Sequence, residues 1–186
     1  MKKVFEISIA LITLFVLLIP VMLISISIFL TSKGSIFYYS DRIGKNNKVF
    51  KMLKFRTMIT QTPQVASDLL ANPEQYHTKI GKFLRKTSLD EIPQLISVLN
   101  GDMSLVGPRP LLYNQYELIQ LRTEKGLDSL LPGITGWAQI NGRDKLSIKE
   151  KIMFDEEYMK RKSFWFDLKI LFLTPKKVFS QDGISH

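Results

Sequence analysis

ISIALITLFVLLIPVMLISISIFL, residues 7–30, decides the architecture of the chain because these 24 successive residues carry no charge. The hydrocarbon core of a bilayer is about 30 Å thick and takes about 20 apolar residues in a helix, so the length fits a single span. A cleaved signal peptide is a poor fit, because the apolar run is too long and no small-x-small cleavage site follows it. The stretch therefore predicts a membrane segment that stays in the protein.

Two features of this segment weaken the interpretation as a straight span and make a re-entrant hairpin an equal alternative. Pro20 lies near its middle, where proline removes a backbone hydrogen bond and breaks the helix into arms of about 11 to 13 residues, each too short to cross. Lysines also flank both ends, with Lys2 and Lys3 before the segment and Lys33 after it. A straight span would place one basic flank outside, against the positive-inside bias. The residues alone leave both topologies open.

Composition limits the chemistry that the remaining chain can perform. The 186 residues suffice for one domain with a real core, and a net charge of +9 indicates anionic partners: nucleic acid, phosphorylated small molecules or an anionic membrane. There is no cysteine and there are only two histidines, His77 and His186. Thiolate metal sites are excluded, and a Ser-His-Asp triad or a histidine zinc site is disfavoured. Carboxylates, arginines and lysines must carry any chemistry, with Mg²⁺ as the expected type of metal.

The first part of the soluble region predicts a small β-hairpin. Residues 35–56 read as two short strands around a Gly-Asn-Asn turn. The second strand is rich in lysine, and we interpret it as a solvated edge guarded by these lysines, with contact to a membrane surface as the functional alternative. The polar stretch 57–78 follows, with a short helix predicted around residues 65–71.

The rest of the chain is mainly helical by pattern. Residues 80–99 predict a helix, a break and a second helix that ends at an Asn100-Gly101 cap. A charged helix is expected from 148 to 162. The aromatic tail 163–179 fits either an interfacial segment or a source of core aromatics. The expected fold class is α+β, rich in helix, with a small β-hairpin or sheet.

The segment SLDEIPQL, residues 88–95, places two carboxylates at a predicted helix start. Ser88 and Glu91 form the S-x-x-E capping-box pattern, and Pro93 is compatible with a first turn. Capping leaves Asp90 unexplained. Because anions are stabilised at a helix start, a carboxylate there stays ionised, and aspartate is a known nucleophile toward phosphoryl groups. Glu91 remains open between a cap and a ligand of Mg²⁺.

Three arginines lie in or near turn-rich segments around this pair: Arg85, Arg109 in GPRP, and Arg143 after an Asn-Gly turn. Planar guanidinium groups suit bidentate contacts to phosphate, and phosphoryl transfer requires positive charge around the phosphate oxygens. Taken singly, each arginine is an ordinary surface ion-pair partner. Together with the Asp-Glu pair they indicate phosphoryl transfer.

These stretches resemble the bacterial sugar transferase family, the monotopic phosphoglycosyl transferases. The resemblance rests on KFLRKTSLDEIPQLISVLNGDMSLVGPRPLL (82–112), LPGITGWAQINGR (131–143) and SFWFDLKILFLT (163–174), behind FKMLKFRTM (50–58) and a proline-interrupted hydrophobic N-terminus. It covers about residues 2–180, and the chain looks like the minimal catalytic form.

The resemblance implies transfer of a phosphosugar from a UDP-sugar to a polyprenol phosphate, usually undecaprenyl phosphate, with release of UMP. The product would start a glycoconjugate such as an O-antigen, a capsule or a protein-linked glycan. The expected location is the bacterial inner membrane, with residues 1–32 as a re-entrant membrane helix and residues 33–186 as a cytoplasmic catalytic domain carrying amphipathic interfacial helices.

By motif match, the resemblance also assigns roles to single residues. Asp90 would attack the β-phosphate and Glu91 would help to bind Mg²⁺. Arg85, Arg109, Arg143 and Asp167 would handle substrate phosphate. Members of this family often carry Ser-Pro at the membrane break, whereas this chain has Ile19-Pro20. It therefore keeps the proline of that pair and lacks the serine.

Two other functions are compatible with parts of the sequence. A membrane-anchored basic module without catalysis would bind anionic lipid or nucleic acid, but the lysines form no dense run with interleaved aromatics, so no nucleic-acid partner is expected. A phosphohydrolase could use the same Asp90–Glu91 pair with water as the acceptor. The sugar and the oligomeric state are left open.

Overall fold

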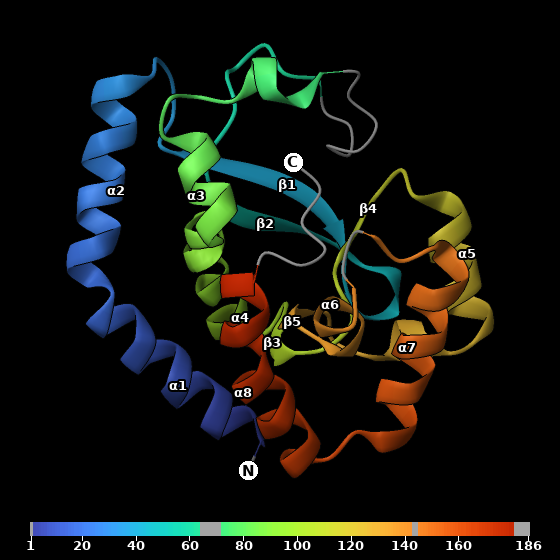
Figure 1. Ribbon diagram of the computed structural model, residues 1–186. Helices are drawn as coiled ribbons and strands as arrows, with labels where there is room; N and C mark the ends of the chain where they lie inside the picture. Colours follow the sequence, from blue (N-terminus) through green and yellow to red (C-terminus); the bar gives the residue numbers. More distant parts are fainter. Residues whose placement is uncertain (1, 64–71, 143–144, 181–186) are drawn as a thin grey trace.

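The computed structural model describes residues 2–63, 72–142 and 145–180, and it confirms a helix-rich α+β fold (Figure 1). The α-helices are α1 (Lys2–Val16), α2 (Leu18–Thr31), α3 (Gly81–Thr87), α4 (Leu95–Asn100), α5 (Tyr116–Glu124), α6 (Trp137–Ile140), α7 (Ile148–Arg161) and α8 (Phe164–Ser180). The strands are β1 (Phe37–Ile43), β2 (Val49–Phe55), β3 (Ser104–Val106), β4 (Leu111–Leu112) and β5 (Gly133–Thr135). Short 3₁₀ helices are η1 (Lys45–Asn47), η3 (Pro73–Tyr76), η4 (Leu89–Gln94) and η5 (Leu127–Ser129).

The hydrophobic N-terminus forms two helices, α1 and α2, that meet at a 60° bend. The predicted break at Pro20 is displaced, because the helices separate at Leu17 and are 15 and 14 residues long. Pro20 is the cause of the break, since a proline ring clashes with the carbonyl four residues earlier, here that of Val16, and supplies no N–H to it. Among the described residues, no single helix has both the length and the apolar character to cross a membrane; α1 and α2 reach that criterion only as a bent pair.

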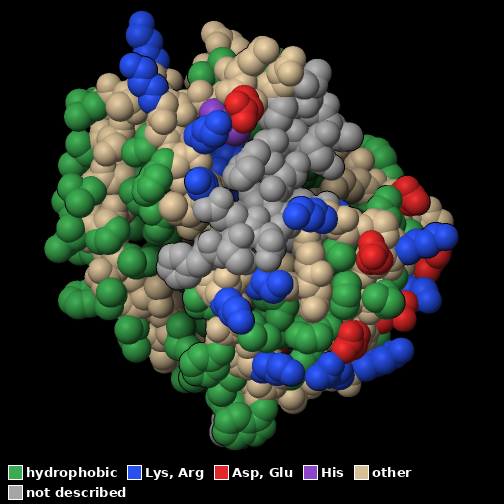
Figure 2. Space-filling model, viewed as in Figure 1, with side chains coloured by type: hydrophobic (Ala, Val, Ile, Leu, Met, Phe, Trp, Pro, Cys, Tyr) green, Lys and Arg blue, Asp and Glu red, His purple; other side chains and the backbone are tan. Residues whose placement is uncertain are grey.

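The two N-terminal helices lie along one side of the molecule, with α3 and α4 beside them (Figure 1). Ala10 and Ile28 are fully buried on their inner faces, whereas Phe15 of α1 and Phe29 and Leu30 of α2 are largely exposed. Figure 2 shows hydrophobic side chains gathered on the side that these helices occupy. Contiguous exposed apolar surface of this kind marks a contact with membrane or with another protein.

The predicted hairpin is confirmed. Strands β1 and β2 pair antiparallel from Phe37 opposite Phe55 to Ile43 opposite Val49, and β4 joins β1 on its other side. The turn uses η1, where Asn46 and Asn47 have positive φ angles of 54° and 57°, a conformation that asparagine tolerates better than most residues. Strand β2 is an edge, as predicted.

The helix–break–helix expected over residues 80–99 is present as α3, η4 and α4. Leu84 on α3 is fully buried, and α4 ends at Gly101 with φ of 85°, the left-handed cap that glycine favours. The predicted charged helix corresponds to α7. The short helix predicted around residues 65–71 lies outside the described residues.

The aromatic tail forms helix α8, which places some of its apolar residues in the core and leaves others exposed. Phe166 and Ile170 are buried in the core, whereas Trp165 and Phe172 are 77% and 80% exposed. The parallel strands β3 and β5 form a second small sheet, and all three residues of β3 are buried. Gly107 begins the turn that carries Arg109, so β3 leads from the core directly into that turn.

Candidate active site

A pocket of about 230 Å³ joins the break of the N-terminal helices to the Asp90–Glu91 segment. Thr13 and Leu17 line it from the break, while Glu91 and Arg109 line it from the soluble part. Leu95 and further aliphatic side chains form much of the remaining wall. The pocket therefore has an apolar side and a charged side.

The local backbone around the carboxylate pair differs from the predicted capping box, which is wrong. Ser88 ends α3 in the left-handed conformation, with φ of 55°, and its N–H donates to the carbonyl of Arg85. An N-cap residue has an extended backbone instead. The Oγ atom of Ser88 is buried and has no hydrogen-bond partner in the described part of the chain. Helix η4 begins at Leu89, directly after Ser88, and contains both Asp90 and Glu91. Asp90 is only 7% exposed.

Glu91 pairs with cations from other elements instead of capping its own helix. The Nζ atom of Lys54 on β2 lies 2.7 Å from its Oε1 atom, and Nη2 of Arg109 lies 3.9 Å from the same oxygen. Burial lowers the pKa of the Lys54 ammonium, while the Glu91 and Asp90 carboxylates oppose that change. Asp90, Glu91, Lys54 and Arg109 therefore form one charged cluster.

Arg42 of β1 adds a second strand-borne cation to this cluster. Burial and, to a lesser extent, the charge of Arg109 lower the pKa of Arg42 to about 10, although Glu91 opposes the change, so Arg42 stays charged at neutral pH. The Nε atom donates to Ser40 Oγ at 3.0 Å, and Nη1 donates to the carbonyl of Pro110 at 3.3 Å. Arg42 thereby links the hairpin to the turn that holds Arg109.

Lys54 and Arg42 are site residues that the sequence interpretation missed, since the lysines of the second strand were assigned to a solvated edge. That assignment is confirmed for the exposed Lys51 and is wrong for Lys54. The signal was the two-residue period of the strands. Lys54 follows the buried Met52 at that spacing and so belongs to the inward face of the hairpin.

The backbone of residues 107–110 is fixed by β5. The N–H of Gly107 donates to Thr135 at 2.9 Å, and the N–H of Gly133 donates to the carbonyl of Pro108 at 2.8 Å. A Cβ atom on Gly107 would lie 2.3 Å from the carbonyl oxygen of Leu131, which explains the glycine at this position. The stiffness predicted for this turn from its two prolines is thus reinforced by hydrogen bonds.

The other predicted site residues are distributed differently. Arg85 lies in the last turn of α3, three residues before Ser88, and Arg143 lies outside the described residues. Asp167, at the start of α8, is not among the residues that line the pocket with Glu91 and Arg109. Asp90 does not line the pocket either, but its charge, like those of Glu91 and Arg109, interacts with Lys54. From the predicted set, the structure therefore brings Glu91 and Arg109 together at the pocket, with Asp90 in the same charged cluster.

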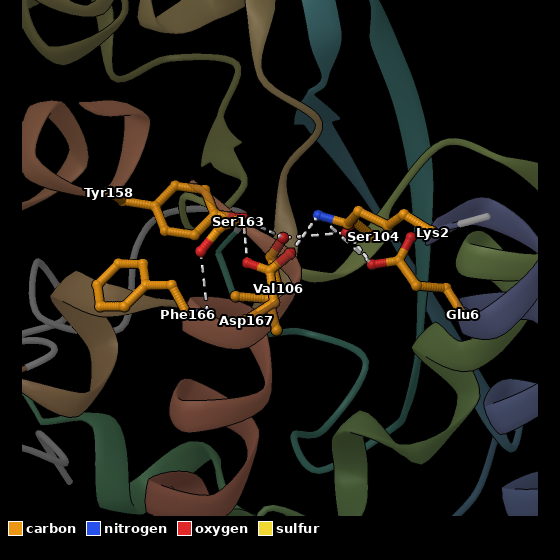
Figure 3. A network of polar contacts seen from close by, with 8 residues as sticks. All are labelled: Lys2, Glu6, Ser104, Val106, Tyr158, Ser163, Phe166 and Asp167. Atoms are coloured by element: carbon orange, nitrogen blue, oxygen red, sulfur yellow. Dashed lines mark hydrogen bonds and ion pairs between the residues drawn. The ribbon is translucent and has the colours of Figure 1, made fainter. Parts of the chain in front are cut away.

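Asp167 instead belongs to a buried polar network at the N-terminus of α1 (Figure 3). Its carboxylate lies 2.6 Å from Nζ of Lys2, and Tyr158 Oη donates to it at 2.8 Å. Burial raises the pKa of the Tyr158 hydroxyl, and the Asp167 charge adds to the rise, so the tyrosine remains a donor. Ser104 Oγ of β3 donates to Glu6 of α1 at 2.5 Å. The network ties α1 to α8 and β3.

The variant Asp167→Asn should therefore lose stability. Removing one charge of a largely buried pair leaves Lys2 and Tyr158 with a weaker partner, and because Lys2 is 35% exposed the expected loss is about 1–3 kcal/mol. Chemical denaturation measures it. Glu156→Gln, which breaks the more exposed pair with Lys125, should change stability by under about 1 kcal/mol. Unchanged stability with lost activity would instead assign Asp167 to phosphate chemistry.

Comparison with known proteins identifies the family. The family model described as bacterial sugar transferase matches residues 1–181, nearly the whole chain. The chain belongs to the bacterial sugar transferase family.

Relatives within the bacterial sugar transferases include proteins of similar and of greater length. An uncharacterized sugar transferase, EpsL, of Bacillus subtilis is 45% identical over 88% of this chain and 80% of its own length. The UDP-glucose:undecaprenyl-phosphate glucose-1-phosphate transferase of Escherichia coli is 43% identical over 92% of this chain but only 39% of its own length. The undecaprenyl-phosphate galactose phosphotransferase of Salmonella typhimurium is 39% identical, and the match covers 81% of this chain and 34% of the relative. The chain thus spans well under half of several relatives.

The donor set of this sugar transferase fits Mg²⁺ only if a substrate completes it. Among the described residues, no three histidine, cysteine, aspartate or glutamate side chains are grouped to hold a metal ion. Mg²⁺ is commonly bound by one or two carboxylates together with substrate phosphates. Glu91 supplies such a carboxylate in the wall of the pocket, so it would hold the ion together with a diphosphate.

Proposed function

We propose that this bacterial sugar transferase moves a phosphosugar from a UDP-sugar to a polyprenol phosphate through a covalent intermediate on Asp90. The observation that carries the proposal is the pocket that joins the apolar break at Leu17 to Glu91 and Arg109. Such a pocket suits a substrate with a long apolar chain and a phosphate head. The names of the relatives from Escherichia coli and Salmonella typhimurium support the same acceptor, undecaprenyl phosphate.

The proposed reaction has two displacements at one phosphorus atom. A carboxylate oxygen of Asp90 attacks the β-phosphorus of the UDP-sugar, the bond from that phosphorus to the bridging oxygen breaks, and UMP leaves with this oxygen. A phosphate oxygen of the acceptor then attacks the same phosphorus and releases the Asp90 carboxylate. Sharing one nucleophile between the steps allows a soluble donor and a lipid acceptor to use the site in turn.

The cations around Asp90 supply what phosphoryl transfer requires. Lys54, Arg42 and Arg109 place positive charge beside the two carboxylates, where it would neutralise the equatorial phosphate oxygens. Mg²⁺, when bound by Glu91 and the diphosphate, would supply further charge neutralisation. The charge of the Asp90 carboxylate interacts with the Lys54 ammonium, and a cation beside it favours the anionic form that a nucleophile requires.

The test of the proposal is release of UMP from UDP-sugars by the purified protein in detergent with Mg²⁺. We expect one UDP-sugar of a panel to give a burst of UMP equal to the enzyme concentration without acceptor, and continuous turnover once undecaprenyl phosphate is added. Continuous release of UMP without an acceptor would indicate a phosphohydrolase. Absence of release with every UDP-sugar would contradict the proposal.

The lowered pKa of Lys54 predicts the alkaline limb of the pH–activity profile. Burial favours the neutral amine, so the cation is lost at a lower pH than in an ordinary lysine. We expect kcat/KM to fall with rising pH at a lower pH than an ordinary lysine would give, and Lys54→Arg to move this limb upward because arginine keeps its charge. Lys51→Arg, at an exposed position of the same strand, is the matched control. An identical limb in Lys54→Arg would contradict the assignment.

We also propose that α1 and α2 form a re-entrant hairpin on the cytoplasmic side of the bacterial inner membrane. The bend of 60° and the exposed apolar side chains of both helices support it. Because the chain has no native cysteine, Lys3→Cys and Lys33→Cys each provide a single reporter. In intact cells both should resist an impermeant thiol reagent, and both should react after permeabilisation. Labelling of Lys3→Cys alone in intact cells would indicate a span.

A further inference from the structure

The backbone carbonyl of Arg109 accepts a hydrogen bond from a buried ion pair, Arg122–Asp155, that has no role in the proposed reaction. Arg122 on α5 donates from Nη1 to the carbonyl oxygen of Arg109 at 2.9 Å. The same guanidinium donates from Nε and Nη2 to Oδ2 of Asp155 on α7, at 3.0 and 2.7 Å. One planar group therefore connects helix α7 to the turn that carries Arg109.

This pair lies deep in the protein. The side chain of Arg122 is 11% exposed and that of Asp155 is 2% exposed. Burying two charges costs solvation free energy that their attraction often only balances, so apolar residues of similar size commonly serve stability as well. The feature that apolar residues could not reproduce is the third contact, from the guanidinium to the Arg109 carbonyl.

The neighbouring carbonyl is held in a similar way by an arginine of the β-hairpin. Arg42 of the hairpin donates to the carbonyl of Pro110 at 3.3 Å. Two successive carbonyl groups of the turn therefore each accept from a buried or half-buried arginine. These contacts fix the peptide planes on both sides of the Pro110 Cα atom. The carbonyl of Pro108 accepts from the N–H of Gly133, so both peptide planes that flank the Arg109 Cα are held, and with them the direction in which its side chain leaves the backbone toward Glu91.

We propose that Arg122 and Asp155 are positioning residues: Asp155 fixes the guanidinium of Arg122, which fixes the backbone of Arg109 and so the place of its side chain in the pocket. The inference rests on the proposed function, because it assumes that Arg109 contacts substrate phosphate. It predicts that kcat/KM is sensitive to the fork geometry of Arg122 and not only to its charge.

The first test is Arg122→Lys, which keeps the charge but cannot hold both Asp155 and the Arg109 carbonyl with one planar group. We expect kcat/KM for UMP release to fall about 10- to 100-fold, the cost of a displacement on the order of 1 Å at a catalytic group. Asp155→Asn provides a second variant. The matched control is Lys125→Gln, which breaks an ion pair of 3.0 Å between Lys125, at the end of α5, and Glu156 on α7 without reaching the turn; its kcat/KM should stay within about twofold of the unsubstituted protein.

A double-mutant cycle separates positioning from folding. If Arg122 acts through Arg109, then Arg122→Lys in an Arg109→Gln background should lower kcat/KM by less than about threefold, with circular dichroism confirming a folded protein. Effects that multiply in the double variant would overturn the inference, and so would unchanged activity in both Arg122→Lys and Asp155→Asn. If either Arg122→Lys or Asp155→Asn fails to fold, the same double-mutant cycle with the other variant tests the inference. Absence of UMP release from the unsubstituted protein would instead overturn the proposed function, and the inference with it.

Discussion

Replacing Asp90 with asparagine is expected to abolish phosphosugar transfer, with UMP release falling by at least about 1,000-fold. Asparagine keeps the shape of the side chain, so the fold should survive, but its amide is not a nucleophile toward phosphorus. The covalent adduct should disappear together with the release of UMP. The measurement is a rate of UMP release with the cognate UDP-sugar and Mg²⁺.

The matched control for this change is Asp102→Asn, because Asp102 is an exposed aspartate just beyond α4. It should retain the rate of the unsubstituted protein within about twofold, as is usual for surface positions. Near-normal release of UMP by the Asp90 variant would show that another group attacks the phosphorus, and the assignment of the nucleophile would fall.

Removal of divalent metal should have the second largest effect. Chelation with EDTA should lower UMP release by at least about 100-fold, because the charge of the diphosphate would be left without its Mg²⁺, and added Mg²⁺ should restore the rate. In Glu91→Gln the concentration of Mg²⁺ needed for half-maximal activity should rise at least about tenfold. The loss of Glu91 also leaves Lys54 without its carboxylate at 2.7 Å, so part of the fall in rate should persist at saturating Mg²⁺.

Glu74→Gln is the control for the metal titration, since Glu74 also pairs with a lysine, Lys82, but at an exposed position where the glutamate is 64% exposed. Its Mg²⁺ requirement should equal that of the unsubstituted protein. Full activity in EDTA would contradict the metal requirement. A Glu91→Gln variant with an unaltered Mg²⁺ requirement would remove Glu91 from the ligands of the ion.

Two occurrences of one sequence pattern show how far local reasoning extends. S-x-x-E occurs at Ser88–Glu91 and at Ser147–Glu150. At Ser147 the structure contains a complete capping box with an extended backbone. Ser88 instead is the C-cap of α3 and has a left-handed backbone conformation. The pattern alone could not separate these cases, because the preceding helix fixes the backbone angle of Ser88. The hairpin, α7 and the Gly101 cap were predictable because their determinants are local.

Contacts between distant segments were not predictable in the same way. Lys54 and Glu91 are 37 residues apart, and only the packing of β2 against η4 makes them an ion pair. The position of the helix break was in reach of sequence reasoning, since proline disturbs the carbonyl four residues earlier, and this places the break before Pro20. The location of Asp167 was not, because it depends on how α1 packs against α8.

A phosphosugar bound covalently to Asp90 can be detected by intact-mass spectrometry of the protein after incubation with its UDP-sugar and Mg²⁺ without acceptor. We expect a mass increase of one phosphosugar, located on Asp90 by peptide fragmentation, that disappears when undecaprenyl phosphate is added. Formation of UMP only in the presence of the acceptor, with no adduct at any time, would contradict it and would indicate direct transfer between the two substrates.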